Sequence, residues 1–236
     1  MQKTRNKNRM FKHVTTTWNP IVGCLHNCKY CWARRLAETK LRHLPQYRDG
    51  FTKPKLVEAA FKRRFKPGDQ VFVSDMGDMW GAWVPDEWIK RVLDYIRGFP
   101  DTTFLFLTKN PGRYLDYTGV IPGNVVLGVT IETNRPTLTA EISDAPSPIL
   151  RYQAMAKLDY PRKLVSIEPI LSFDHEVMVE WIRDIDPEIV YVGYDNYGNM
   201  LIEPPLKHTL RLVRELRRMG YRVEAKTLRK AWYEIK

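Results

Sequence analysis

The sequence is poor in cysteine: it has three, and all of them lie between Cys24 and Cys31. Because an odd number of thiols cannot pair completely as disulfides, and these are close in sequence, they are suited to converge on one metal centre. The lack of any other cysteine excludes a second cysteine-ligated cluster. It also excludes a spare thiol acting as hydrogen donor, methyl carrier or thiyl radical. Three cysteines leave one coordination position for another ligand.

Three interpretations of the cysteine loop are open from the residues alone. A structural zinc site needs a fourth protein ligand, for which the candidates are His26, His13 and His43, none at a familiar zinc-finger spacing. A buried cluster of inert thiols needs no metal at all. An iron–sulfur cluster with a fourth ligand that is not protein needs only the three cysteines, and this interpretation is favoured here.

Other features are also missing from the chain. No run approaches the roughly 18 apolar residues of a membrane span, and the basic N-terminus leads into no apolar signal core. No Gly/Ser/Pro-rich linker divides the 236 residues, of which 44% are hydrophobic. We therefore expect one folded domain over residues 1–236 in the reducing cytoplasm, with no membrane partner.

Positive charge is in excess and is concentrated at both ends. The net charge is +11, gathered in a basic N-terminal arm (residues 1–13) and again from Lys207 onward, including a C-terminal extension (residues 220–236). One interpretation is an electrostatic surface for RNA or DNA, because Lys and Arg bind phosphates with release of counterions. The alternative is that the arginines between 211 and 218 form the solvated face of an amphipathic helix.

Short β-rich runs alternate with segments of helical length, which indicates repeated βα units and a parallel sheet. The predicted strands are Val14–Trp18, Gln70–Ser74, Thr103–Thr108, Val125–Ile131, Lys163–Ile167 and Ile189–Gly193, with a further strand-like run at Tyr221–Ala225. The predicted helices are Tyr30–His43, Lys55–Phe65, Pro85–Arg97, Gly112–Tyr117, Ile149–Leu158, His175–Arg183 and Pro205–Met219. The fold class is α/β, and six such units with right-handed crossovers curve toward a partial barrel.

The cysteine loop resembles that of the radical S-adenosylmethionine (radical SAM) superfamily, in its Cys-x-x-x-Cys-x-x-Cys spacing and in the aromatic Tyr30 before the last cysteine. Further landmarks are similar to those of the bacteriophage-type branch of this superfamily. They are Thr17–Cys24 with its Trp-Asn-Pro-x-x-Gly-Cys leader, Val71–Asp78, Phe106–Pro111, Leu127–Glu132 and Val165–Pro169. The chain departs from the branch at Gly193–Asn196, where a Gly-Gly-Glu-Ser turn is usual.

The resemblance implies a partial (βα)6 barrel with the cysteine loop after the first strand. It implies that Cys24, Cys28 and Cys31 hold a [4Fe–4S] cluster whose free iron binds S-adenosylmethionine (AdoMet). An external one-electron reductant would then drive cleavage of AdoMet to methionine and a 5′-deoxyadenosyl radical, which abstracts hydrogen from a substrate. The remaining landmarks would lie at the carboxyl ends of strands, where α/β folds bind ligands.

The resemblance also implies roles for residues at the strand ends. Ser74, Asp75 and Met76 would meet the methionyl amino group of AdoMet, with a helix N-cap or turn role as the alternative for Asp75. Thr130 and Glu132 would lie near the ribose hydroxyls. Two cofactor candidates remain. Tyr30 would lie against the adenine, with packing in the core as the alternative. Lys109 would neutralise a carboxylate, with exposure to solvent as the alternative.

Glu168 is predicted from its apolar neighbours, because a carboxylate among them is costly unless it is paired or functional. It would face the cofactor or substrate pocket, or pair with a structural arginine. Tyr194 and Asp195, at the end of the sixth strand, are candidates for catalytic residues. The alternative is that the segment from Asp195 onward forms a turn without a catalytic role.

We expect a radical SAM enzyme that modifies or repairs a nucleic acid. The alternatives are a non-catalytic zinc or iron–sulfur module that binds nucleic acid, and a radical SAM enzyme acting on a peptide or small molecule.

Overall fold

The structure is a computed structural model that describes residues 11–234. Most of the predicted basic arm (residues 1–10) and the last two residues of the predicted extension (235–236) lie outside the described part. None of the described helices is long and apolar enough to cross a membrane.

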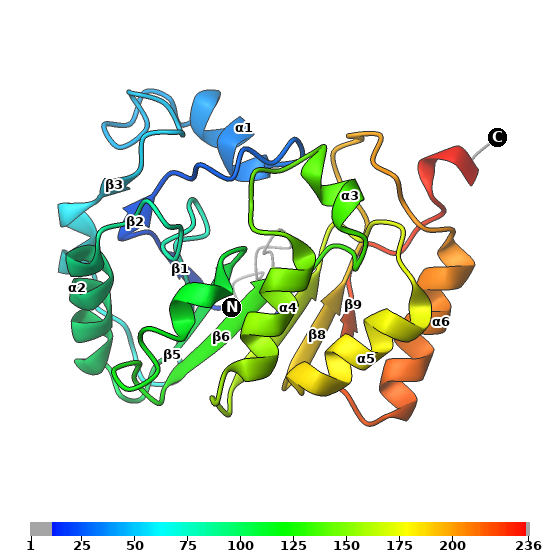
Figure 1. The fold of residues 1–236 in the computed structure, drawn as a ribbon. Coiled ribbons are helices and arrows are strands. Elements are labelled where there is room, and N and C mark those ends of the chain that lie inside the picture. Colours follow the sequence, from blue (N-terminus) through cyan, green and yellow to red (C-terminus); the bar gives the residue numbers. More distant parts are fainter. Residues whose placement is uncertain (1–10, 235–236) are drawn as a thin grey trace, which may run out of the picture.

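Seven parallel strands form one curved sheet, and helices cover its outer face (Figure 1). In spatial order the strands are β1 (Thr16–Trp18), β4 (Gln70–Val73), β5 (Thr103–Thr108), β6 (Val125–Thr130), β7 (Lys163–Ile167), β8 (Ile189–Val192) and β9 (Val223–Ala225). Apart from β1 and β4, neighbours in space are also consecutive strands of the chain, so each connection is a crossover. The predicted α/β partial barrel is confirmed.

Both faces of the sheet are apolar, which explains why the strands appear in the sequence as continuous apolar runs. One core lies between the outer face and the helices and includes Val71, Phe104 and Val165. A smaller core fills the inner face of the barrel and consists of Phe11, Val14, Phe72, Leu105, Val126, Leu164, Ile189 and Tyr191. The inner core is formed mainly by residues in the first halves of the strands, so the polar side chains gather at the strands' carboxyl ends.

The helices that cover the sheet pack through amphipathic faces. They are α2 (Asp86–Arg97), α4 (Pro148–Lys157), α5 (His175–Ile185) and α6 (Leu206–Arg218). In α2 the buried residues are Ile89, Val92, Leu93 and Ile96, which share one side of the helix. These four helices agree with the sequence prediction to within two residues at each end.

The C-terminal extension contributes to the barrel. Within it, β9 pairs in parallel with β8, with Val190 opposite Val223. Beyond β9 the chain leads to the 3₁₀ helix η3 (Trp232–Glu234), which contacts the loop after β8. The strand-like run predicted at Tyr221–Ala225 is thus a seventh strand of the sheet.

Four local predictions need correction. The predicted helix Lys55–Phe65 is the short strand β3 (Lys55–Leu56) followed by the 3₁₀ helix η1 (Glu58–Lys62). The reason is long-range pairing: β3 lies antiparallel to β2 (Ile21–Val22), which leads into the cysteine loop. The predicted helix Tyr30–His43 is only α1 (Trp32–Glu38). The predicted helix Gly112–Tyr117 is instead the 3₁₀ helix η2 (Pro111–Tyr114), which begins one residue earlier. The helix α3 (Pro136–Ala140) was not predicted.

Two glycines let the cysteine loop approach the end of β4. Gly23 and Gly77 form an isolated parallel bridge, and Gly23 has a φ of 86°. A Cβ at Gly77 would lie 2.8 Å from the carbonyl oxygen of Gly23. The loop and the strand end therefore meet backbone to backbone.

We predict that Gly77→Ala lowers the free energy of unfolding by about 1–3 kcal/mol, because the added methyl group has no room beside the Gly23 backbone. Denaturant unfolding would measure the change. Gly119→Ala is the matched control, since a Cβ there meets no atom within 4 Å. Equal stability of the two variants would contradict the close approach.

Candidate active site

The cysteine loop lies between β2 and α1, at the end of the barrel where the strands finish (Figure 1). All three thiols are free, and Cys28 is buried whereas Cys24 and Cys31 are half-buried. Cys31 is the N-cap of α1, where its sulfur accepts a hydrogen bond from Arg34 N at 3.3 Å. The Cys24 sulfur accepts from His26 N at 3.4 Å, and the Cys28 sulfur lies 3.1 Å from Ser143 Oγ.

No group of three or more Cys, His, Asp and Glu side chains among residues 11–234 converges as a ready metal site. Each sulfur instead has its own local partner. Of the proposed fourth zinc ligands, His26 is bonded to Asp78, His13 contacts Tyr191 within the inner core, and His43 is exposed in the turns after α1. None of the three histidines is therefore marked out as a fourth ligand.

A polar cavity of about 420 Å³ reaches the cysteine loop. Its lining includes Cys28 and Cys31, the α1 residues Arg34 and Arg35, and Ser143 after α3. This volume is in the range of small-molecule sites in proteins. Burial raises the pKa of the Cys24 thiol well above its usual range, and the nearby Asp78 carboxylate raises it further.

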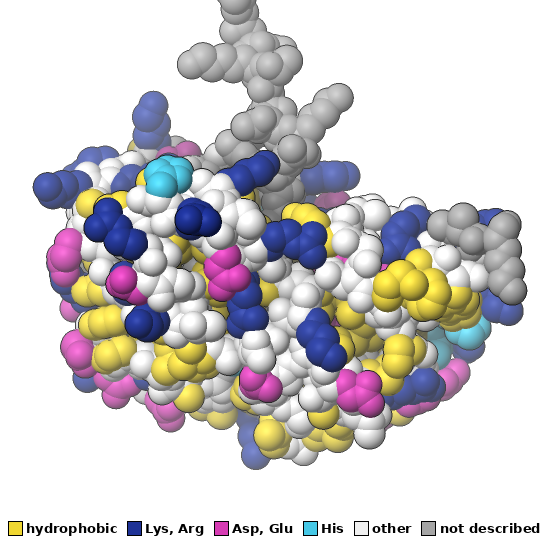
Figure 2. All heavy atoms as spheres, turned by 90° about the horizontal axis from the view of Figure 1, so that it is seen from above, with side chains coloured by type: hydrophobic (Ala, Val, Ile, Leu, Met, Phe, Trp, Pro, Cys, Tyr) yellow, Lys and Arg dark blue, Asp and Glu magenta, His cyan; other side chains and the backbone are white. Residues whose placement is uncertain are grey.

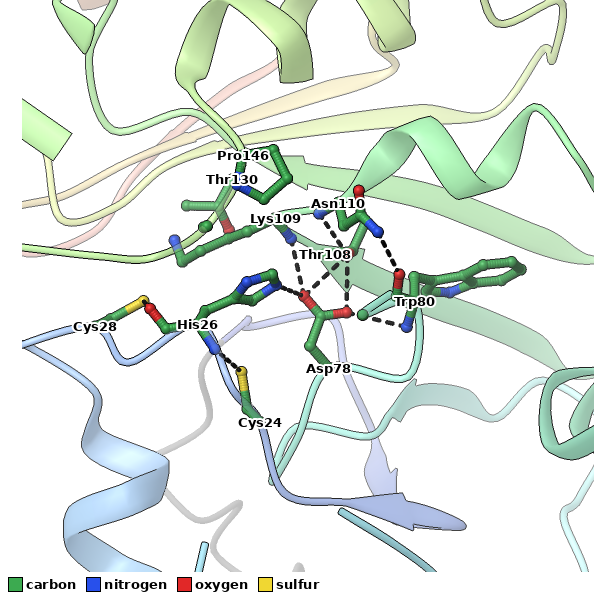
Figure 3. Close-up of polar contacts among 12 residues, drawn as sticks. Cys24, His26, Cys28, Asp78, Trp80, Thr108, Lys109, Asn110, Thr130 and Pro146 are labelled. Atoms are coloured by element: carbon green, nitrogen blue, oxygen red, sulfur yellow. Dashed lines mark hydrogen bonds and ion pairs between the residues drawn. The ribbon is translucent and has the colours of Figure 1, made fainter. Parts of the chain in front are cut away.

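Asp78 connects the cysteine loop to two strand ends (Figure 3). Its carboxylate is bonded to His26 Nε2 at 2.9 Å and accepts from Thr108 Oγ1 at 2.8 and 2.9 Å. It also accepts from the backbone amides of Lys109 and Trp80, at 3.0 and 3.1 Å. Burial alone would raise the pKa of Asp78, but the contacts with His26 and the hydrogen bonds from Lys109 N and Thr108 Oγ1 together outweigh it and lower the pKa.

The segment after β4 holds the three residues predicted to meet the amino group of AdoMet. Ser74 is buried with a φ of 56°, and its hydroxyl has no hydrogen-bond partner within the described structure. Asp75 Oδ1 accepts from Asn19 Nδ2 at 2.7 Å, while burial raises the pKa of Asp75. The amide of Met76 donates to Asn19 Oδ1, and its carbonyl accepts from Gly23 N. Asn19 thus fixes this turn, a role that sequence reasoning missed.

Glu132 is the centre of a buried charge network at the end of β6. It is fully buried and accepts from Arg151 Nη1 at 2.6 Å, and also from Lys109 Nζ and the Tyr30 hydroxyl. Burial would raise the pKa of Glu132, but the charges of Arg151 and Lys109 outweigh it and lower the pKa to about 2. Glu132 is therefore a carboxylate at neutral pH.

The network assigns internal partners to three predicted cofactor residues. Lys109 does neutralise a carboxylate, but that carboxylate is Glu132 of the chain itself, and Tyr30 is held by the same group. Thr130 is buried at the end of β6, and its carbonyl accepts from Arg151. Arg151, from α4, was missed by sequence reasoning because an arginine in a helix carries no sign of which strand end it reaches.

Glu168 faces the end of β9. Its Oε1 lies 2.9 Å from Lys226 Nζ, and its Oε2 accepts from Ser166 Oγ at 3.1 Å. Burial raises the pKa of Glu168, and the Lys226 charge opposes that effect. The alternative that Glu168 pairs with a structural arginine is wrong in the identity of the partner, which is Lys226, the residue that follows β9.

The two catalytic candidates have structural partners. The Tyr194 hydroxyl is buried, donates to Pro204 O at 3.0 Å, and lies 2.7 Å from Thr209 Oγ1 of α6. It is thereby directed at a helix on the outside of the barrel. The Asp195 carboxylate accepts from Asn199 N at 2.7 Å and Tyr197 N at 3.2 Å. These hydrogen bonds close a turn, which is the structural role given above as the alternative for Asp195.

The fold of the chain is similar to that of solved structures of radical SAM enzymes. Spore photoproduct lyase with bound AdoMet and dinucleoside spore photoproduct superposes with a TM-score of 0.57 at 14% identity, covering 84% of this chain and 59% of the lyase. SuiB of Streptococcus suis bound to the precursor peptide SuiA superposes with a TM-score of 0.56 at 11% sequence identity, and the match covers 89% of this chain and 48% of SuiB. SuiB bound to S-adenosylmethionine superposes with a TM-score of 0.56 at 9% sequence identity, and the match covers 94% of this chain and 52% of SuiB. The chain thus spans about half to three fifths of these proteins.

Residues 8–190 match the family described as "Protein of unknown function (DUF5131)", and the chain belongs to this family. No curated protein matches the sequence.

We predict that Asp78→Ala loosens the cysteine loop, because His26 and two backbone amides lose their shared buried acceptor. In cluster-free protein, alkylation of the Cys24 thiol should become about tenfold faster, measured by mass spectrometry. Asp94→Ala, which removes an exposed carboxylate of α2, should leave the rate unchanged. An unchanged rate in Asp78→Ala would mean that the loop is held without this carboxylate.

We predict that Glu132→Gln destabilises the protein by about 3–5 kcal/mol near neutral pH, because it leaves Arg151 and Lys109 buried without their counter-charge. The pKa of Glu132 is lowered from 4.5 to about 2, so its contribution is fully present above about pH 4.5 and is lost as the pH falls toward 2. The stability difference between wild type and variant should shrink over that range.

Thermal unfolding at several pH values would measure this difference. Glu188→Gln is the matched control, because Glu188 forms a surface ion pair with Arg162 and should change stability by less than about 1 kcal/mol. A stability difference that stays constant from pH 6 to pH 2.5 would contradict the role given to Glu132.

Proposed function

We propose that the protein is a radical SAM enzyme, in which Cys24, Cys28 and Cys31 bind a [4Fe–4S] cluster and the strand ends bind AdoMet. One observation carries the proposal: three free thiols with Cys-x-x-x-Cys-x-x-Cys spacing lie directly after the first strands of a radical SAM fold. The Trp-Asn-Pro leader and the later landmarks support assignment to the bacteriophage-type branch. We treat residues 1–236 as one radical SAM domain, and the free thiols fit a cytoplasmic location.

The residues present fit these groups. Three thiolates leave one iron of a cubane cluster without a protein ligand, which is the position that AdoMet requires. Ser74 supports the same proposal, since it has a buried hydroxyl without a partner beside the Gly23–Gly77 contact. Asp75 is a partly buried carboxylate whose pKa is raised by burial, and a cationic ammonium group would favour its charged form.

When bound, the cluster and AdoMet would supply a 5′-deoxyadenosyl radical after transfer of one electron from an external reductant. The residues of the chain hold and orient these groups. Asp78 fixes the loop through His26, and Asn19 fixes the turn that carries Asp75 and Met76. Glu132 holds Tyr30, the residue that directly precedes Cys31.

We propose a nucleic acid as the substrate. The net charge of +11 favours a polyanion. Among the structural neighbours, spore photoproduct lyase is bound to a dinucleoside, whereas SuiB is bound to a peptide, so the fold accommodates both classes. The charge of this chain favours the first.

The test is anaerobic reconstitution with iron and sulfide, followed by addition of dithionite and AdoMet and chromatographic measurement of 5′-deoxyadenosine. We expect about four irons per chain, a brown protein, and product that falls to background in Cys28→Ala. Zinc in place of iron, or product that survives in Cys28→Ala, would overturn the proposal. Wild-type and variant proteins should be compared by circular dichroism, so that loss of cluster is not confused with loss of fold.

A further inference from the structure

The exposed aromatic side chains of residues 11–234 lie in two segments that contact each other, the loop after β8 and the turn η3. They are Tyr197, Trp232 and Tyr233, which are 49%, 41% and 41% exposed. Met200 and Ile202, the former the most exposed large apolar side chain of the described residues, lie in the same loop as Tyr197. We call these five residues the aromatic patch. Its composition is unusual because every other aromatic ring of the described chain is at least partly buried.

The two segments of the aromatic patch are bound to each other. Trp232 Nε1 donates to Leu201 O at 2.7 Å, and the Tyr233 hydroxyl donates to Glu203 O at 2.9 Å. Glu203 also accepts from both guanidinium nitrogens of Arg229, at 2.6 and 2.8 Å. The loop after β8 and the C-terminal turn η3 are therefore joined by hydrogen bonds. Figure 2 shows a group of hydrophobic side chains at the right-hand edge of the molecule, the side on which α6 lies in Figure 1.

Arg35 joins the aromatic patch to the cavity at the cysteine loop. Its guanidinium lies 5.1 Å from the centroid of the Tyr197 ring, and its Nη2 donates to Asn199 Oδ1 at 3.4 Å. The same side chain lines the 420 Å³ cavity that reaches Cys28 and Cys31. A ligand on the aromatic patch would thus extend directly to the candidate active site.

Charged groups of both signs surround the aromatic patch. Beside it, Glu203 accepts from Arg229, and Glu234 accepts from Leu206 N and Ala231 N and lies near the charge of Lys230. Among residues 11–234, the Arg35 guanidinium contacts the neutral Asn199 and the Tyr197 ring and forms no ion pair with a carboxylate, and Lys230 is exposed. The cavity itself is mixed, because Glu38, Glu141 and Asp144 oppose Lys29, Arg34 and Arg35 there. The cations available to a ligand at this surface are therefore Arg35, which lines the cavity and also contacts Tyr197, and Lys230.

We propose that the aromatic patch, together with Arg35 and Lys230, binds a single-stranded or locally unpaired nucleic acid and leads it to the cysteine loop. Bases would stack on Tyr197 and Trp232, and the two cations would contact phosphates, which is how proteins bind single strands without reading their sequence. This inference rests on the proposed function, whose substrate class it makes specific.

The test is fluorescence anisotropy of a labelled twelve-nucleotide single strand, DNA or RNA, with the full chain and no cluster. Tyr197→Ala should weaken binding by about 5-fold to 100-fold, since stacking on one aromatic side chain is worth about 1–3 kcal/mol per base. Tyr197→Phe keeps the ring and should bind as wild type, which also controls for folding. Arg35→Gln should weaken binding and reduce the slope of log affinity against log salt by about 0.7.

Arg214→Gln and Arg218→Gln on the outer helix α6 are the matched charge controls and should change affinity only slightly. If they weaken binding as much as Arg35→Gln, or if Tyr197→Ala binds as wild type, the patch is not the binding surface. Binding of an apolar peptide with a salt slope near zero, and no binding of either nucleic acid, would overturn the substrate class.

Failure of the two proposals can be told apart, because binding is measured without cluster or AdoMet. A chain that forms 5′-deoxyadenosine but does not bind the oligonucleotide overturns the patch and leaves the radical SAM proposal intact. A chain that binds the oligonucleotide through Tyr197 but holds zinc instead of iron overturns the radical SAM proposal and leaves the binding role of the patch intact.

Discussion

The buried carboxylate of Asp78 is the contact on which the arrangement of the candidate site depends. It joins three segments that are distant in sequence: the cysteine loop through His26, the turn after β4, and the end of β5 through Thr108 and Lys109. A carboxylate is buried at high cost unless its oxygens are well bonded, and here four groups bond to it: His26 Nε2, Thr108 Oγ1 and the amides of Lys109 and Trp80. The loop that carries the thiols is thus anchored to the sheet by one group, while the Gly23–Gly77 contact brings the backbones close enough for that group to reach.

A second buried charge acts on the other side of the cysteine loop. Glu132 is surrounded by Arg151, Lys109 and Tyr30, which come from α4, the end of β5 and the loop itself. Two cations and one anion leave a net positive charge in a buried place, and Arg151 Nη2 has no partner within the described structure. Because Lys109 contacts Glu132 through its side chain and Asp78 through its backbone, the two networks are physically continuous. Displacement of either carboxylate would be transmitted to the same strand end.

The sequence was sufficient for the sheet and for the positions of the polar strand ends, but not for their partners. The strands Thr103–Thr108 and Lys163–Ile167 agree with prediction at both ends, because burial on both faces makes them uninterrupted apolar runs. The segment around Glu58 has the composition of a helix, yet pairing of β3 with β2 prevents one, and local propensity carries no sign of that pairing. Arg151 and Lys226 bind Glu132 and Glu168 across 19 and 58 residues. Such partners depend on how helices and strands are arranged in space, which no spacing in the sequence reveals.

The distribution of apolar and polar residues along the barrel sets the direction from which a ligand approaches. The inner core, from Phe11 to Tyr191, fills the inner face along the first halves of the strands. At the other end, the inner face carries the Glu168–Lys226 pair, and Gly193 has no room for a side chain because a Cβ there would lie 2.8 Å from Glu168 Oε1. A ligand therefore reaches the thiols from the face where the strands finish. That face is also where the chain has placed its exposed aromatic rings, so a substrate held on them is already on the open side of the barrel.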